Sequence, residues 1–272
     1  MTDSANERST TASTAEILKR VEALAPLIEG QAAASEDQGH LTDLMVESLH
    51  GQKMFRLLLP KPYGGEEVTP ATFMQAIEAV AQLDASTAWC LCQQNGCSMS
   101  AAIADPDIAA LVWGDDPAGA LAWGPGKATA VPVEGGYRVT CDLAFCSGMH
   151  NSTWLGAHCL VLEDGEPRKW TDGKTEVRTM LIPKSEVEIK PIWDVIGLRA
   201  TGSDGYVLKD HFVPEAHSVM RDKEEALTYR SPLYLFRQTN LYASGFSGVA
   251  MGIARSMLEA LKKLSIDKRP RL

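Results

Sequence analysis

The hydrophobic period of the sequence changes twice, and this feature constrains the fold more than any other. In the first 115 residues, apolar side chains such as Ile17, Val21 and Leu24 recur every three or four positions, which is typical of amphipathic helices. From Gly119 to about residue 220, short β-rich runs alternate with turn-forming residues. The helical period returns after Pro232. The sequence therefore predicts an α+β multidomain protein: a helical block, a β block and one long helix.

Residues that favour helix ends locate the helices. Ser13 or Thr14 can cap the first helix, and Glu16 places a negative charge in its first turn. Pro70 suits the first turn of a helix that ends near Leu83. We expect helices over residues 14–31, 40–54, 70–83, 84–104, 106–114 and 235–264.

The β block contains one hairpin and several further strands. Gly135 and Gly136 can take the positive φ angles that a tight turn requires. Further strands are expected over residues 154–162, 177–182, 187–190 and 206–213. Short, evenly spaced strands favour a small sandwich or barrel.

These patterns predict four segments. Residues 1–13 are expected to be disordered, residues 14–117 to form an N-terminal α-helical domain, and residues 118–222 a middle β domain. Residues 223–272 are expected to be the first, incomplete part of a C-terminal helical domain. The long helix needs a partner for its apolar stripe, either on the first block or in sequence beyond this chain.

Composition limits the kinds of partner that the protein can bind and the cellular compartment in which it is expected. The formal net charge of −9 argues against nucleic acid, whose binding proteins usually carry a basic stripe. No stretch approaches 18 consecutive apolar residues, so no membrane span is expected. The six cysteines do not resemble a disulfide framework, which favours the reducing cytoplasm.

Two groups of residues resemble functional motifs but lack the spacing that those motifs require. Gly245, Gly248 and Gly252 have the wrong spacing for a dinucleotide fingerprint and follow no strand, so we expect them on a closely packed helix. No metal site is expected, because the residues with metal-ligand side chains match no common zinc spacing: Cys146, His150, His158 and Cys159.

Three segments of the β block, residues 122–128, 145–150 and 197–204, combine aromatic, hydroxyl and glycine residues. Together they offer stacking surfaces and hydrogen-bonding groups, which are what a flavin ring requires. The same residue types also suit ordinary turns, so the residues alone leave both interpretations open.

Several motifs resemble the acyl-CoA dehydrogenase superfamily. They are the P-x-x-Y-G-G loop at residues 60–65, the segment 84–89 between two helices, and the G-x-R-x-T-x-S segment at 197–203 followed by Val213-Pro214. The resemblance covers the chain from about residue 14. It implies a further C-terminal four-helix bundle that builds a homotetramer, so the chain is expected to be C-terminally truncated.

Within this superfamily, residues 123–125, 145–148 and 153–154 look most like the two-component flavin-dependent aromatic monooxygenases. That branch implies an oxygenase component that receives reduced FMN or FAD from a separate, transiently acting flavin reductase. It implies hydroxylation of an aromatic or polycyclic small molecule through a flavin C4a-hydroperoxide. Alternatives are an acyl-CoA dehydrogenase-like FAD enzyme that oxidises a thioester, and a catalytically incompetent fragment or assembly partner.

The resemblance also assigns roles to residues. Ser147 is the expected catalytic residue, with its hydroxyl near flavin N5. The expected flavin-binding residues are Trp123, Gly124, Ser147, Gly148, Trp154, Arg199, Thr201 and Ser203. Relatives often carry a histidine on the helix around residues 95–98, where this chain has Asn-Gly-Cys-Ser. The acid or base that acts on the substrate is therefore unassigned.

Overall fold

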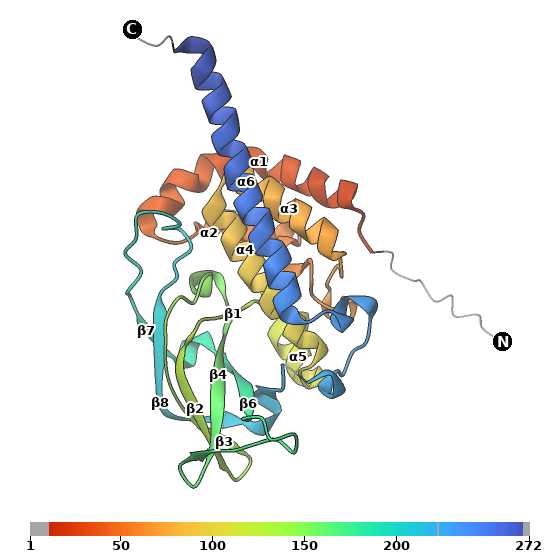
Figure 1. The fold of residues 1–272 in the computed structure, drawn as a ribbon, viewed down its shortest axis with the longest axis vertical. Helices are drawn as coiled ribbons and strands as arrows, with labels where there is room; N and C mark the ends of the chain where they lie inside the picture. The colour runs from red at the N-terminus through yellow and green to blue at the C-terminus, as the bar shows by residue number, and fades with distance from the viewer. Residues whose placement is uncertain (1–10, 222, 269–272) are drawn as a thin grey trace, which may run out of the picture.

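The computed structural model describes residues 11–221 and 223–268, and it begins with a helical block. Five helices precede the sheet in the chain: α1 (Thr14–Gln38), α2 (Asp43–Gly51), α3 (Pro70–Leu83), α4 (Ala85–Ser98) and the short α5 (Pro106–Ala109). The apolar faces of α1 to α4 share one core (Figure 1), whereas Ala109 of α5 packs in a separate cluster with Val112 and Trp113. Residues 1–10 of the segment expected to be disordered lie outside the described residues.

Capping residues fix the helix ends much as their side chains predict. Ser13 caps α1 in a capping box with Glu16. Asp84 caps α4, its carboxylate accepting a hydrogen bond from the Thr87 amide at 2.6 Å. The expected helix over residues 84–104 is shorter than predicted, because a 3-10 turn over Met99–Ala102 follows α4. Likewise α1 extends past residue 31, to a left-handed Gly39.

The β block is a mixed sheet of nine strands in the described part of the chain. In chain order they are β1 (Leu121–Trp123), β2 (Gly126–Val133), β3 (Gly136–Leu143), β4 (Trp154–Glu163), β5 (Glu166–Pro167), β6 (Val177–Pro183), β7 (Glu188–Lys190), β8 (Gly205–Pro214) and β9 (Ser218–Val219). The main path runs β7-β8-β3-β2-β4-β6-β9, with β1 and β5 pairing to β4. The β2–β3 hairpin turns at Gly135, as expected. Side chains of β2, β3, β4, β6 and β8 share a second core.

Helix α6 (Gln238–Asp267) returns across the helical block and packs closely on α3 and α4 (Figure 1). Its three glycines make this approach possible. A Cβ at Gly248 would lie 2.6 Å from the Met74 carbonyl oxygen, and one at Gly252 would lie 2.5 Å from that of Glu78. Gly245 is equally close to α4. The expectation that these glycines serve close helix packing is confirmed.

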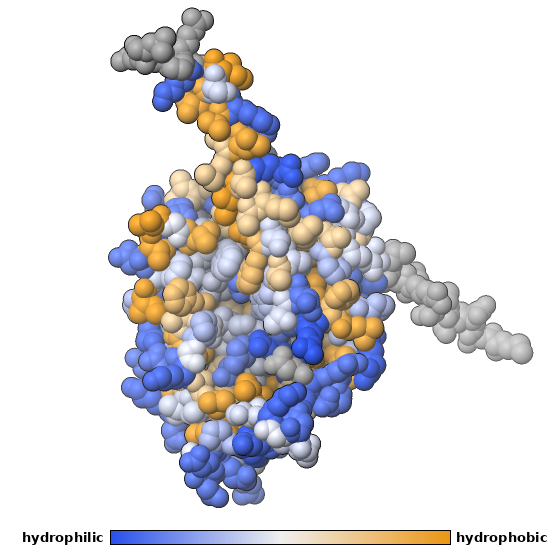
Figure 2. Space-filling view, viewed as in Figure 1, coloured by the Kyte–Doolittle hydropathy of each residue, from blue (hydrophilic) through white to orange (hydrophobic). Residues whose placement is uncertain are grey.

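The later part of α6 extends beyond the body of the molecule and carries apolar side chains on its surface (Figure 2). These exposed side chains are Met257, Leu258, Leu261, Leu264 and Ile266. No helix among the described residues is long and apolar enough to cross a membrane.

Candidate functional site

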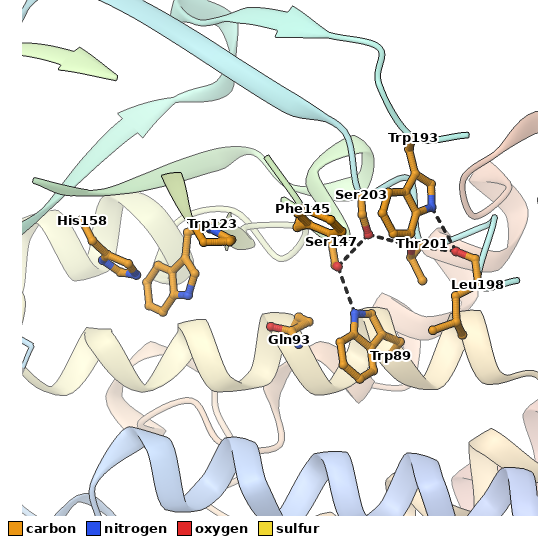
Figure 3. A pocket seen from close by; sticks show the side chains of 12 residues that line it. Trp89, Gln93, Trp123, Phe145, Ser147, His158, Trp193, Leu198, Thr201 and Ser203 are labelled. Carbon is orange, nitrogen blue, oxygen red and sulfur yellow. Dashed lines mark hydrogen bonds between the residues drawn. The ribbon is translucent and has the colours of Figure 1, made fainter. Parts of the chain in front are cut away.

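A cavity of about 380 Å³ lies between α4 and the turns that project from the sheet (Figure 3). This volume is within the range of about 300–1,000 Å³ that is typical of small-molecule sites. Its walls are mainly aromatic and hydroxyl side chains, with a few others: Trp89, Gln93, Trp123, Gly124, Pro125, Phe145, Ser147, His158, Trp193, Leu198, Thr201 and Ser203. The cavity therefore combines flat apolar surfaces with a small number of polar groups.

A chain of hydrogen bonds crosses the wall of the cavity (Figure 3). The Trp89 indole N–H donates to Ser147 Oγ at 2.9 Å, and Ser147 Oγ lies 2.7 Å from Ser203 Oγ. Ser203 Oγ lies 2.7 Å from Thr201 Oγ1, whose hydroxyl donates to the Leu198 carbonyl at 2.8 Å.

The two ends of this chain fix its direction. An indole N–H only donates and a carbonyl only accepts, and each hydroxyl has a single hydrogen. Thr201 uses its hydrogen on Leu198, so Ser203 must donate to Thr201, and Ser147 must donate to Ser203. The remaining capacity of the Ser147 hydroxyl is one oxygen lone pair. Ser147 therefore offers an acceptor, not a donor, to a ligand in the cavity.

Backbone hydrogen bonds join the two turns that carry these hydroxyls. The Cys146 amide donates to the Asp204 carbonyl and the Gly148 amide to the Thr201 carbonyl, both at 2.9 Å. Two cavity-lining residues, Phe145 (φ 54°) and Leu198 (φ 55°), adopt the left-handed conformation. Such strain in non-glycine residues is retained where surrounding structure enforces it, commonly at functional sites.

Asp204 holds the segment that carries Trp193. Its carboxylate accepts hydrogen bonds from the amides of Ile192 at 2.7 Å and Trp193 at 2.8 Å, and from His150 Nε2 at 2.8 Å. Burial alone would raise the pKa of Asp204, but these hydrogen bonds outweigh burial and lower it. Trp193 then meets Phe145 edge to face, with ring centroids 5.4 Å apart.

At the other end of the cavity, Trp123 packs against both His158 and Arg221. The Trp123 and His158 rings lie 4.8 Å apart, and the Arg221 guanidinium lies 5.3 Å from the Trp123 ring centroid. Arg221 donates to His158 Nε2 at 3.0 Å, so the imidazole hydrogen is on Nδ1, facing Thr179 Oγ1 at 2.8 Å. Burial, and then the Arg221 charge, lower the pKa of His158 to about 3. His158 is therefore neutral at physiological pH.

The lowered pKa of His158 predicts acid sensitivity. Below about pH 6.5 the imidazole is protonated in the unfolded chain but not in the folded one, so stability falls as the pH falls toward 3. Between pH 7 and pH 5 this amounts to about 2 kcal/mol. In urea unfolding, the free energy of unfolding of His158→Gln should fall less between pH 7 and pH 5 than that of the unsubstituted protein. The difference between the two losses should be about 2 kcal/mol. His211→Gln, which removes a half-buried imidazole of β8 that pairs with Glu186, is the control, and an equal pH response of the two variants would contradict the prediction.

Five of the eight predicted flavin-binding residues line this one cavity: Trp123, Gly124, Ser147, Thr201 and Ser203. Gly124 must be glycine for a local reason, because a Cβ there would lie closer than 3.0 Å to the Ala144 carbonyl oxygen and to Cys146.

The other three predicted residues do not line the cavity. Gly148 lies behind Ser147, with its carbonyl accepting from Ser152 at 3.0 Å. Trp154 lies at the start of β4 and packs edge to face on His217. Arg199 is exposed and its Nε donates to the Glu36 carbonyl at 3.3 Å.

Sequence reasoning missed most of the aromatic lining. Trp89 is on α4, whose burial is nearly continuous, so periodicity did not show that its ring faces the sheet. Trp193 is in an irregular segment, and only its hydrogen bonds to Asp204 and Leu198 bring it to the cavity. The one feature of the sequence that pointed to Trp89 was its place in the segment 84–89, which resembles a motif of the acyl-CoA dehydrogenase superfamily.

Comparisons with known proteins agree with this architecture. No protein-family model matches the chain. The chain is 32% identical over 246 residues to a flavin-dependent monooxygenase oxygenase subunit, HsaA, of Mycobacterium tuberculosis, covering 88% of this chain and 60% of that protein. The crystal structure of the M. tuberculosis HsaA monooxygenase matches with a TM-score of 0.82 and 30% identity, over 92% of this chain and 68% of that one. XiaF from Streptomyces sp., in complex with FADH2 and glycerol, matches with a TM-score of 0.81 and 26% identity, over 92% and 63%.

The helical block, the mixed sheet and the long returning helix around one aromatic cavity define an acyl-CoA dehydrogenase-like fold. Within that fold, the chain belongs to the family of oxygenase subunits of two-component flavin-dependent monooxygenases. It spans about 60% of the length of the M. tuberculosis HsaA sequence that it matches.

Proposed function

We propose that the protein acts as the oxygenase component of a two-component monooxygenase. It takes reduced FMN or FAD from a separate flavin reductase and uses O2 to hydroxylate an aromatic or polycyclic small molecule. The two HsaA relatives reported above are a monooxygenase oxygenase subunit and a monooxygenase, which favours this function over thioester oxidation. The cytoplasmic setting and the homotetramer remain predictions.

The acceptor character of Ser147 carries the proposal. Reduced flavin has an N–H at N5 where oxidised flavin has a bare nitrogen, so the lone pair of Ser147 matches the reduced ring. The faces of Trp89, Trp123 and Trp193 suit stacking on a flat heterocycle. Ser147 itself is only 6% exposed, so a bound ring at this point is shielded from bulk water.

When bound, reduced flavin supplies the electrons that activate O2 for transfer to the substrate. The protein's own groups bind and orient the ring and keep water out. Trp89 and Ser203 hold the Ser147 hydroxyl in one orientation, so its oxygen meets the ligand without rearrangement.

Anaerobic titration with reduced and oxidised FMN and FAD tests this function. We expect the reduced forms to bind more tightly, and Ser147→Ala to weaken reduced-flavin binding about tenfold, as loss of one hydrogen bond predicts. Oxidised flavin should be affected less. Ser98→Ala, which removes a buried hydroxyl that donates to the Asn95 carbonyl away from the cavity, is the matched control. A folded protein that binds neither redox form would contradict the proposed function.

A further inference from the structure

A second cavity, of about 440 Å³, adjoins the end of the first one formed by Trp123 and His158. It lies between the 3-10 turn after α4, the segment from β5 to β6, and the segment that leads into α6. Met99, Ile103, Trp170 and Phe236 supply much of its apolar surface. Arg221 links the two cavities, because it lines the second cavity and contacts Trp123 and His158 of the first.

The described lining of the second cavity carries more positive than negative side chains, although the chain as a whole has a formal net charge of −9. Its charged lining residues are Asp172, Lys174, Arg221, Lys223, Glu224 and Arg237. Lys174 and Lys223 both pair with Asp172, at 3.6 and 3.4 Å. By contrast, Arg221 and Arg237 form no ion pair with a carboxylate among the described residues.

No carboxylate among the described residues pairs with the positive charge of Arg221. The side chain is half-buried, it stacks on Trp123, and its partner His158 is neutral. A neutral imidazole satisfies one guanidinium hydrogen but offsets no charge. A partly buried cation without a counter-charge is costly, and a bound anion would remove that cost.

The start of α6 adds to this positive field. Arg237 is the N-cap residue of α6 and makes no side-chain capping hydrogen bond, and Gln238 begins the helix. Both residues line the second cavity. The first turn of this 30-residue helix receives no side-chain cap, and its helix dipole favours negative charge there.

We propose that the second cavity binds an organic carboxylate, with Arg221 and Arg237 holding the carboxylate and the apolar wall holding an aromatic or aliphatic body. Arginine suits this role because its planar guanidinium matches a carboxylate. We assign this molecule as the substrate, an assignment that rests on the proposed function. It follows from the position of Arg221, directly behind the Trp123 wall of the first cavity.

Isothermal titration of the flavin-free protein with 3-phenylpropanoate and with its neutral amide, 3-phenylpropanamide, tests the inference. The acid and the amide have the same apolar body and differ in charge. We expect the acid to bind at least about tenfold more tightly at low salt, as a charge-assisted hydrogen bond predicts. Arg221→Gln and Arg237→Gln should each weaken binding of the acid about tenfold and leave the amide unchanged.

Lys209→Gln, on the exposed face of β8, removes the same charge at a distance and should leave the affinity for the acid unchanged. If Arg221→Gln does not fold, the exposed Arg237→Gln variant still decides the question. Equal affinity for acid and amide, or an equal loss in Lys209→Gln and Arg237→Gln, would overturn the inference.

Two further arms separate this site from the flavin site. Displacement of 3-phenylpropanoate by FMN but not by riboflavin would assign the arginines to the phosphate of the cofactor and overturn the substrate assignment. Carboxylate binding by a protein that binds no reduced flavin would keep the anion site and reject the proposed function. Flavin binding without selective carboxylate binding would keep the proposed function and reject the anion site.

Discussion

Replacement of Gly96 by alanine is expected to lower the free energy of unfolding by about 3 kcal/mol, the upper part of the range for overpacking. A Cβ at Gly96 would lie closer than 3.0 Å to the ring of Tyr242 on α6. That ring cannot yield easily, because its hydroxyl lies 3.3 Å from Cys97 Sγ and 3.4 Å from the Gln93 carbonyl oxygen. Urea unfolding followed by tryptophan fluorescence measures the change.

The sign of this effect distinguishes it from helix propensity. Gly→Ala inside a helix ordinarily stabilises by about 0.5–1 kcal/mol. Gly30→Ala in α1 is the matched control, since its added Cβ would meet no atom within 4 Å beyond the neighbouring backbone of its own helix, and it should show that ordinary gain. A gain of similar size at Gly96 would show that α6 does not pack against α4 as described.

Replacement of Asp204 by alanine is expected to cost about 3 kcal/mol and to weaken flavin binding. The change leaves the amides of Ile192 and Trp193 and the ring of His150 without their acceptor, and each such loss costs about 1–3 kcal/mol, with partial relief from water. Without these bonds the Trp193 segment is no longer held at the cavity. Thermal unfolding and anaerobic flavin titration measure the two effects.

Asp204→Asn separates the hydrogen bonds from the charge. The asparagine carbonyl can still accept from the two amides, and its NH2 group can donate to a neutral His150. We expect a loss of about 1 kcal/mol and near-normal flavin affinity. If alanine and asparagine have the same effect, the two backbone amides do not depend on this side chain.

Local sequence patterns were sufficient to predict most of the elements. Pro70 and Asp84 determine where α3 and α4 begin, because proline and aspartate suit those positions through their own chemistry. The hairpin at Gly135 has the same kind of local cause. By contrast, the pairing of β3 with β8 joins segments far apart in sequence, and no local pattern encodes it.

The residues of the candidate site also fall into those that the sequence predicted and those that it did not. The turns that carry Ser147 and Thr201 were recognisable from composition and from a family motif, and the structure brings their hydroxyls into one hydrogen-bonded chain. Arg199 has the right chemistry, but the turn directs it toward Glu36 on α1. Side-chain direction and the aromatic lining depend on tertiary packing, which a single sequence does not reveal.

The contact between Trp89 and Phe246 couples α6 to the ligand cavity mechanically. The two rings lie face to face, with centroids 5.0 Å apart and planes 11° apart, and the indole of Trp89 holds Ser147. Trp89 therefore joins α6 to the Ser147 hydroxyl through one ring contact and one hydrogen bond. By thermodynamic linkage, a ligand that binds one position of this indole more tightly would also favour the matching position of Phe246 on α6.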